Sequence, residues 1–226
     1  MGKNQRKWKH YEFLKEERAL LKHLPETKRL KKQSFWELMD KYHQVIVKPC
    51  AGRLGVGVTQ VSVIDKNLYE IHSENKKTII TSKAEVYNHF KDIKKCCIVQ
   101  QKIPLATIKG CPFDVRVVIR RGRNSSKWGI TKRFAKLAAN GFIITNAAQK
   151  ILPVEEAIRK SSLNHPLLSA KDLVSKIDEV VHLATKQLEP FYPERRSIGF
   201  DIGLDQKGGA WFIEANIKSK DRNAGY

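Results

Sequence analysis

Residues 45–64 have the sequence VIVKPCAGRLGVGVTQVSVI, and this stretch decides the fold class. A β-branched run ends at Pro49, three glycines follow at positions 52, 55 and 57, and residues 58–64 alternate between apolar and polar side chains. The pattern predicts two strands joined by a glycine-rich loop. A Walker A loop and a Rossmann fingerprint are both excluded, because their glycines lead into a helix whereas a strand follows here.

The loop is a candidate phosphate site. Glycines let backbone N–H groups approach a phosphate closely, and Lys48 supplies a point charge just before them. An ordinary glycine-rich hairpin would explain the loop alone equally well, so both interpretations stay open.

The rest of the chain alternates between helical and strand patterns. Apolar spacing, with capping boxes at Ser34 and Ser82, predicts helices over residues 8–24, 34–42, 82–94, 153–160 and 169–188. Strands are expected within 68–81 and over 97–100, 113–120, 129–137, 142–145, 198–204 and 211–215, with a tight hairpin at Asn140-Gly141. We therefore predict a mostly antiparallel α+β fold in two unequal lobes. The expected divisions are an N-terminal helical segment (1–44), a small lobe (45–100) and a large lobe (101–226).

The composition indicates a folded protein with an anionic partner. The 226 residues are 41% hydrophobic and carry a net charge of +20, and no apolar run approaches the length of a membrane span. The basic N-terminus is followed by no apolar segment, so a secretory signal is not expected. Half of the net charge lies in residues 102–150, where eleven Lys and Arg residues accompany a single acid, Asp114. Nucleic acid, an anionic surface or a phosphate-bearing small molecule would each fit this charge.

The four cysteines predict reduced thiols in a cytosolic protein. Cys50, Cys96, Cys97 and Cys111 lack the C-x-x-C spacing of a zinc site and are too few for a disulfide scaffold.

A candidate metal site lies near the C-terminus. Glu214 and Asn216 are two positions apart and share a strand face, and a hairpin through the glycines at 208 and 209 would bring Asp201 beside them. Two carboxylates and an amide oxygen suit Mg²⁺. Solvated polarity of an edge strand is the alternative, although Glu214 follows an apolar stretch in which an unused carboxylate is costly.

A second polar set surrounds the motif Asp114-Val115-Arg116. Arginine forks suit phosphate oxygens, and Arg133 and Asn146 follow downstream. For an isolated D-x-R motif, a structural pair between Asp114 and Arg116 is the favoured alternative.

The order of these motifs carries more information than any one of them. The chain has Lys7, LPET at 24–27, VIVKP at 45–49, VQQ at 99–101, DVR at 114–116, TN at 145–146, FDIG at 200–203 and EAN at 214–216. In this order they resemble the ATP-grasp superfamily, and within it the YheC/YheD-like group that is often labelled endospore coat-associated. The resemblance covers about residues 7–216 and implies an ATP-grasp fold with the nucleotide between the two lobes.

The resemblance also implies residue roles. Nucleotide contacts would come from Lys7 and Lys48, with a lid over the phosphates formed by Gly52, Arg53, Gly55, Val56 and Gly57. The interlobe hinge beside adenine would be Gln100, Gln101, Lys102 and Ile103. The catalytic pair would be Arg116 and Arg133, the Mg²⁺ ligands Asp201, Glu214 and Asn216, and the remaining cofactor-binding positions Asp114 and Asn146.

The implied activity is that of an ATP- and Mg²⁺-dependent ligase that joins a carboxylate to an amine through an acyl phosphate. The surplus positive charge predicts that at least one of these two unidentified substrates is anionic. Ile217 and Lys218 replace the small residue and proline that often follow Asn216 in the family, and this motivates an alternative: a nucleotide-binding or spore-structural protein with impaired turnover. Nucleic-acid binding, suggested by charge alone, ranks below both because no recognised motif accompanies it. We expect a cytoplasmic protein with no membrane partner, and the resemblance implies spore association.

Overall fold

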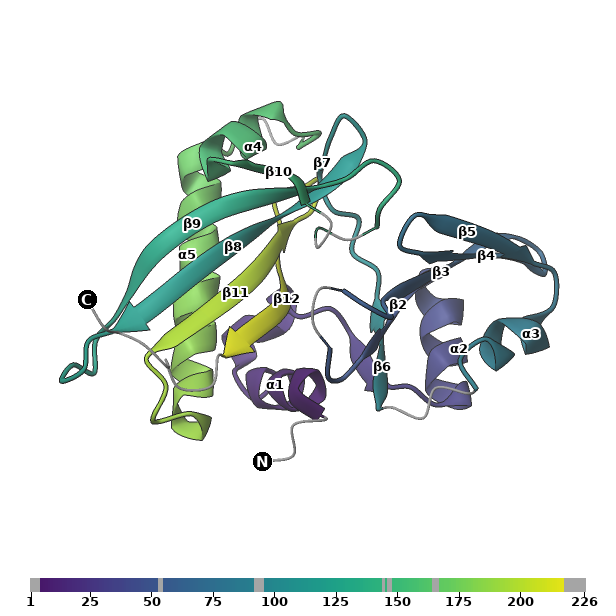
Figure 1. The fold of residues 1–226 in the computed structure, drawn as a ribbon, viewed down its shortest axis with the longest axis horizontal. Coiled ribbons are helices and arrows are strands. Elements are labelled where there is room, and N and C mark those ends of the chain that lie inside the picture. Colours follow the sequence, from purple (N-terminus) through teal and green to yellow (C-terminus); the bar gives the residue numbers. More distant parts are fainter. Residues whose placement is uncertain are drawn as a thin grey trace.

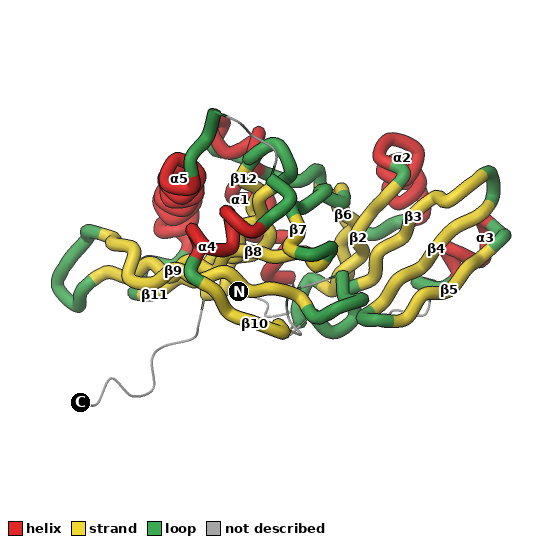
Figure 2. The backbone as a smooth tube through the Cα atoms, turned by 90° about the horizontal axis from the view of Figure 1, so that it is seen from above, coloured by secondary structure: helices red, strands yellow, loops and turns green. Residues whose placement is uncertain are grey.

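The chain forms two lobes, each built on an antiparallel sheet (Figure 1). The computed structural model describes residues 5–52, 55–91, 96–143, 145, 148–163 and 167–217. Figure 2 shows the two sheets side by side, with α2 and α5 each above its own sheet.

The small lobe contains the glycine loop. Its sheet has the strand order β1-β6-β2-β3-β4-β5, and all five pairings are antiparallel. The strands are β1 (Thr27–Arg29), β2 (Gln44–Pro49), β3 (Thr59–Asp65), β4 (Leu68–Ser73), β5 (Lys76–Ile80) and β6 (Cys97–Gln101). The helices α2 (Lys32–Tyr42) and α3 (Lys83–Asn88) supply Phe35, Leu38 and Val86 to its core.

The large lobe has the strand order β10-β9-β8-β11-β12, with β7 paired to β8. Its strands are β7 (Thr107–Ile108), β8 (Cys111–Arg121), β9 (Trp128–Ala138), β10 (Ala148–Leu152), β11 (Ser197–Leu204) and β12 (Ala210–Ile217). Its helices are α1 (Arg6–Leu14), α4 (Val154–Lys160) and α5 (Ala170–Leu188), with 3-10 turns η2 (Arg18–His23) and η3 (Glu189–Phe191).

The long helix α5 explains why one face of the large sheet is apolar. Its buried stripe, which includes Ile177 and Val181, shares one core with Val115 and Val117 of β8. Both valines are fully buried, as the alternation in residues 113–120 predicts. The even-numbered residues of β8 therefore point away from α5, and this open face carries the polar site.

The N-terminal 44 residues divide between the lobes. Leu14 and Leu20 enter the core of the large lobe, whereas β1 and α2 belong to the small lobe. The predicted helix over 8–24 is interrupted: α1 ends at Leu14 and η2 begins at Arg18, where the Glu17 side chain accepts from the Ala19 N–H. The predicted cap at Ser34 lies one turn inside its helix, because α2 begins at Lys32 and the Ser34 hydroxyl bonds the Lys31 N–H.

The predicted strand over 142–145 is wrong for the residues that are described there. Phe142, Ile143 and Thr145 are outside any strand, and the partner of β9 begins at Ala148. Gly141 has φ +80°, and its carbonyl accepts from His72 of the small lobe at 3.0 Å. The turn at Asn140-Gly141 is therefore present, but contact with the other lobe draws the chain away from immediate strand pairing.

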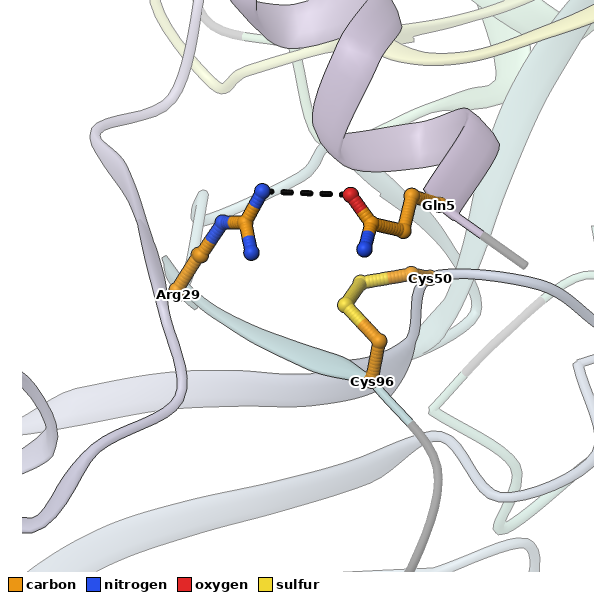
Figure 3. Close-up of a disulfide and its surroundings, with 4 residues drawn as sticks. All are labelled: Gln5, Arg29, Cys50 and Cys96. Carbon is orange, nitrogen blue, oxygen red and sulfur yellow. Dashed lines mark hydrogen bonds between the residues drawn. A yellow bond between two sulfur atoms is a disulfide. The ribbon is translucent and has the colours of Figure 1, made fainter. Parts of the chain in front are cut away.

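The expectation that all four thiols are reduced is also wrong. Cys50 and Cys96 form a disulfide with Cα atoms 5.4 Å apart (Figure 3). Cys50 directly follows β2 and Cys96 directly precedes β6, and these two strands are antiparallel neighbours. A separation of 46 residues hid this pairing from the sequence. Within the described ranges, no helix is long and apolar enough to cross a membrane.

Candidate functional site

A polar cluster lies on the open face of the large sheet, opposite α5. We call it the Asp201 cluster, and its members come from four adjacent strands: Asp114 and Arg116 (β8), Lys136 (β9), Asp201 (β11) and Asn216 (β12). The strand register brings them together, since Arg116 pairs with Asp201, Asp114 pairs with Lys136, and Glu214 lies opposite Asp201 on β12. Long-range strand pairing therefore assembles the cluster.

Asp201 is the centre of the cluster. Arg116 donates to both of its oxygens, from Nε at 2.7 Å and from Nη2 at 2.8 Å. Lys136 Nζ lies 3.0 Å from Oδ1, and Asn216 Nδ2 donates to Oδ2 at 3.1 Å. Two cations thus neutralise one carboxylate, and the bidentate fork fixes the guanidinium plane.

The remaining nitrogen of the Arg116 guanidinium lies beside a glycine. Nη1 takes no part in the bonds to Asp201, and it lies beside Gly199, where an added Cβ would be 3.4 Å away.

Asp114 holds Lys136 from the other side. Its Oδ1 is 3.0 Å from Lys136 Nζ, and its Oδ2 accepts from the Thr145 hydroxyl. Burial raises the pKa of Asp114 to about 6, and the nearby charge of Asp201 acts in the same direction. The Lys136 ammonium lowers the pKa of Asp114 and so opposes that rise. The same ammonium contacts both Asp114 and Asp201.

A pocket lies between the lobes, and Glu214, which is opposite Asp201 in the sheet, forms part of its wall. Its walls come from α1 (Lys7, His10), β2 (Lys48), β6 (Ile98, Gln100) and β12 (Phe212, Glu214). Lys7 Nζ is 3.4 Å from Glu214 Oε1, and Lys48 Nζ donates to the Ile213 carbonyl at 3.2 Å. Four predicted residues thus line one pocket: Lys7, Lys48, Gln100 and Glu214.

Lys48 is buried, and this changes its acidity. Removal from water lowers the pKa of its ammonium group to about 8, with Glu214 opposing the shift and Lys7 adding to it. An anionic ligand would offset that cost by supplying negative charge.

The amide of Gln100 has a defined orientation. The Thr27 hydroxyl donates to the Pro25 carbonyl at 2.8 Å, so its oxygen accepts from Gln100 Nε2 at 2.6 Å. This bond uses one of the two hydrogens of the NH₂ group and fixes which end of the amide is the carbonyl oxygen, the atom that could accept from a ligand in the pocket.

The glycine loop joins β2 to β3. Gly55 and Gly57 have φ of +68° and +77°, and a Cβ on Gly57 would lie 3.1 Å from Pro49 Cγ. Gly52 and the exposed Val56 belong to the same connection. Both positive φ values explain why glycine occurs here. Arg53 lies outside the described residues.

Three predicted hinge residues do not line the pocket. Gln101 accepts from the Glu26 N–H at 3.2 Å through its side chain, Lys102 donates to the Ile103 carbonyl at 3.0 Å, and Ile103 is buried. Their contacts connect β6 to the N-terminal segment and to the following turn.

Arg133 is not part of the Asp201 cluster. It faces α5, where its Nε donates to Asp178 at 2.7 Å. The residue that reaches the cluster from β9 is Lys136, which our sequence reasoning missed. A signal existed: Arg133 has the same parity as the apolar Ala135 and Leu137, so strand alternation assigns it to the core face. Asn146 lies outside the described residues.

The three predicted magnesium ligands lie together, although Arg116, Lys136 and Asn216 contact both oxygens of Asp201 and Lys7 lies beside Glu214. Asp201 and Glu214 are opposite one another on β11 and β12, and the Asn216 amide uses its nitrogen on Asp201, which leaves its oxygen available. Two carboxylates and an amide oxygen are hard donors of the kind that Mg²⁺ takes together with substrate phosphates. Among the described residues, no group of three His, Cys, Asp or Glu side chains suited to a metal occurs.

The sequence matches the family described as YheC/D-like ATP-grasp over residues 3–224. The chain belongs to this ATP-grasp family. It is 30% identical over 202 residues to the endospore coat-associated protein YheD of Bacillus subtilis (strain 168), covering 80% of this chain and 41% of that protein. The chain therefore spans about two fifths of the length of the curated relative it matches.

Solved structures share the ATP-grasp fold at low identity. N5-carboxyaminoimidazole synthetase from Staphylococcus aureus complexed with ADP has a TM-score of 0.57 and 12% identity, over 96% of this chain and 46% of that one. D-alanyl-alanine synthetase A from Vibrio cholerae has a TM-score of 0.55 and 12% identity, over 95% and 55%. L-amino acid ligase from Bacillus licheniformis has the same TM-score and identity, over 95% and 40%. The predicted α+β ATP-grasp fold is thus confirmed, and these structural neighbours are synthetases and ligases.

Proposed function

We propose that this chain binds ATP between its lobes and uses it, with Mg²⁺, to activate a carboxylate for attack by an amine. The observation that carries the proposal is the Asp201 cluster beside a pocket lined by Lys7 and Lys48. A closely packed set of cations and metal-binding oxygens next to an apolar-walled pocket suits phosphoryl transfer.

The pocket chemistry favours adenine. Ile98 and Phe212 supply apolar surface, and the free carbonyl of Gln100 can accept from an exocyclic amino group. Guanine presents a carbonyl oxygen where adenine has that amine. Two acceptors would then face one another, so GTP should bind more weakly.

The basic side chains divide between binding and transfer. Lys7 and Lys48 would offset the charge of the phosphates, while Arg116 and Lys136 would face the phosphoryl group in transit. In the first step, a carboxylate oxygen of the substrate attacks the γ-phosphorus and ADP leaves. In the second, an amine nitrogen attacks the acyl carbon, inorganic phosphate leaves and the amine loses a proton. Asp114 would keep Lys136 in place through both steps, because it binds the ammonium from the side away from Asp201.

Asp201, Glu214 and Asn216 are the residues that would hold Mg²⁺. When bound, the ion would neutralise phosphate oxygens and orient the γ-phosphate.

An anionic second substrate would suit the open face of the sheet. Lys132 is exposed on that face with its Nζ 5.3 Å from the centre of the Phe134 ring, and Phe134 pairs with Arg116. A carboxylate beside an apolar group could use both features.

Titration of a non-hydrolysable ATP analogue with and without Mg²⁺ tests the proposal. Glu214→Ala should abolish Mg²⁺-dependent binding, whereas Glu155→Ala, an exposed glutamate of α4, should leave it unchanged. Undiminished binding in the Glu214 variant would contradict the metal assignment. A panel of amino acids and small peptides, assayed for ADP release, then tests for turnover.

A second candidate is a nucleotide-binding protein without turnover. The name of the Bacillus relative, a coat-associated protein, favours it. Tight analogue binding with no ADP release from any carboxylate and amine pair would support this candidate over a ligase.

A further inference from the structure

The Cys50–Cys96 disulfide lies where three walls of the nucleotide pocket meet. Cys50 follows β2, which carries Lys48 two residues earlier, and Cys96 precedes β6, which carries Gln100. The same bond adjoins α1, because the Lys7 N–H donates to the Cys50 carbonyl at 3.0 Å. We call this meeting point of β2, β6 and α1 the junction. Each of the three elements contributes a side chain that lines the pocket: Lys48, Gln100 and Lys7.

Hydrogen bonds flank the disulfide, and the β2–β6 ladder begins beside it with the Pro49–Cys97 and Lys48–Ile98 pairs. The Cys50 N–H donates to the Cys96 carbonyl at 2.8 Å, and above it Arg29 donates to Gln5 at the start of α1 at 3.1 Å (Figure 3). The Arg29–Gln5 bond is exposed, so water competes for both partners. The disulfide adds a covalent link where the β2–β6 ladder meets the start of α1.

The junction also connects the two lobes. Helix α1 packs on the core of the large lobe through Leu14, whereas β2 and β6 are central strands of the small lobe. A change at Cys50 acts directly on Lys7, whose ammonium binds Glu214, and on Lys48, which reaches the Ile213 carbonyl.

We propose that this disulfide is a redox-sensitive brace: when it is intact it holds Lys7, Lys48 and Gln100 in position for a nucleotide, and its reduction weakens nucleotide binding. The inference rests on the function proposed above. It concerns the regulation of that site by a thiol reductant.

The chemistry is ordinary thiol–disulfide exchange. Cys50 is fully buried and Cys96 is partly exposed, so an incoming thiolate attacks the Cys96 sulfur and Cys50 leaves as a thiolate that takes up a proton. A second thiol of the reductant then releases Cys96. A dithiol thus supplies two electrons and becomes a cyclic disulfide, while Cys50 and Cys96 each gain a hydrogen.

Reduction leaves the two backbone hydrogen bonds of Cys50 in place but without their covalent support. The junction then opens more often. A smaller fraction of the protein molecules has Lys7, Lys48 and Gln100 in position, and the apparent affinity for a nucleotide falls with that fraction. We expect the Kd of a non-hydrolysable ATP analogue to rise about five- to thirtyfold, because ordering the backbone of a single residue costs a factor of about this size.

The test compares the same protein before and after dithiothreitol treatment, with Cys50→Ser/Cys96→Ser as the fixed reduced state. Protein purified without reductant and then denatured should show two titratable thiols, and four after reduction. Cys111→Ser removes a buried thiol at the start of β8 in the large lobe and is the matched control, which should retain the response to reductant.

Hydrogen exchange supplies a second measurement that needs no substitution. The Lys7 and Cys50 amides should lose protection on reduction, while amides in the centre of α5 should not. Equal analogue affinity in the oxidised and reduced states, or four thiols before reduction, would overturn the brace alone. If the analogue bound in neither state, the nucleotide site itself would be wrong, and the brace would fail with it.

Discussion

The two faces of the large-lobe sheet use the same strands for different purposes. On β8, Val115 and Val117 are buried against α5, while Asp114 and Arg116 meet Lys136 and Asp201 on the other face. The face under α5 stabilises the fold through buried apolar side chains, and the open face carries the charged side chains of the Asp201 cluster. Strand parity, rather than residue type, decides which basic side chain belongs to the Asp201 cluster.

Two basic residues of β9 make the same point. Arg133 and Lys136 are three positions apart, yet the first binds Asp178 of α5 and the second binds Asp201. An odd spacing on a strand places side chains on opposite faces. Arg133 therefore lies on the helix-covered face, and Lys136 lies on the open face that carries the Asp201 cluster.

The largest expected effect lies on the helix-covered face. Ile119→Ala removes a fully buried side chain next to α5 and should lower the free energy of unfolding by roughly 2–5 kcal/mol through lost burial and a cavity. Denaturant unfolding measures the loss. The affinity of the folded variant for the ATP analogue should be unchanged. A fall in affinity comparable with that of a pocket variant would contradict the separation of a structural face from a ligand-binding face.

The next largest effect separates the two arginines. Arg116→Met should reduce ADP formation about 100-fold or more, since it removes a charge from the proposed path of the phosphoryl group. Arg133→Met deletes the same charge from the opposite face and serves as the control, with activity expected within about threefold of the parent because surface ion pairs contribute little. Both are measured once a productive carboxylate and amine have been found. Similar losses in the two variants would contradict the assignment.

A smaller effect tests Lys48, which completes the pocket from the other lobe. Its pKa is lowered to about 8 by burial, so the free protein loses this positive charge as the pH rises above 8. Bound phosphates favour the charged form, and the analogue Kd should therefore rise by about tenfold between pH 7 and 9.

Lys48→Arg is the matched variant for that measurement, because an arginine stays charged over the whole range. Its analogue affinity should be lower overall but nearly independent of pH from 7 to 9. If the Kd of this variant still rose between pH 7 and 9, a group other than Lys48 would be responsible for the pH dependence.

Much of the fold could be predicted from local patterns. The alternation of apolar and polar residues in β8 and the glycines that follow β2 specify strands and a loop without reference to the rest of the chain. Helix α5 lies within one residue of its predicted limits because its apolar stripe is long and regular. The order of the site motifs also led to the confirmed ATP-grasp fold.

The site was predicted less completely. Lys7, Lys48, Gln100 and Glu214 do line one pocket, and Asp114, Arg116, Asp201 and Asn216 do form one cluster. Lys136 was missed, although the alternation that assigns Arg133 to the core face assigns Lys136 to the open one. The expected strand over 142–145 failed because the Gly141 carbonyl bonds His72 of the other lobe, which local propensity cannot include.

By itself the sequence determined most of the strands, the long helix, the glycine loop and the order of chemical motifs, since each depends on side-chain periodicity or on backbone freedom within a few residues. Only the tertiary structure decided which residues meet. It placed Lys136 between Asp114 and Asp201, turned Arg133 toward α5, and brought Cys50 to Cys96 across 46 residues. Such contacts depend on strand register and on the packing of one lobe against the other, and both are properties of the assembled chain.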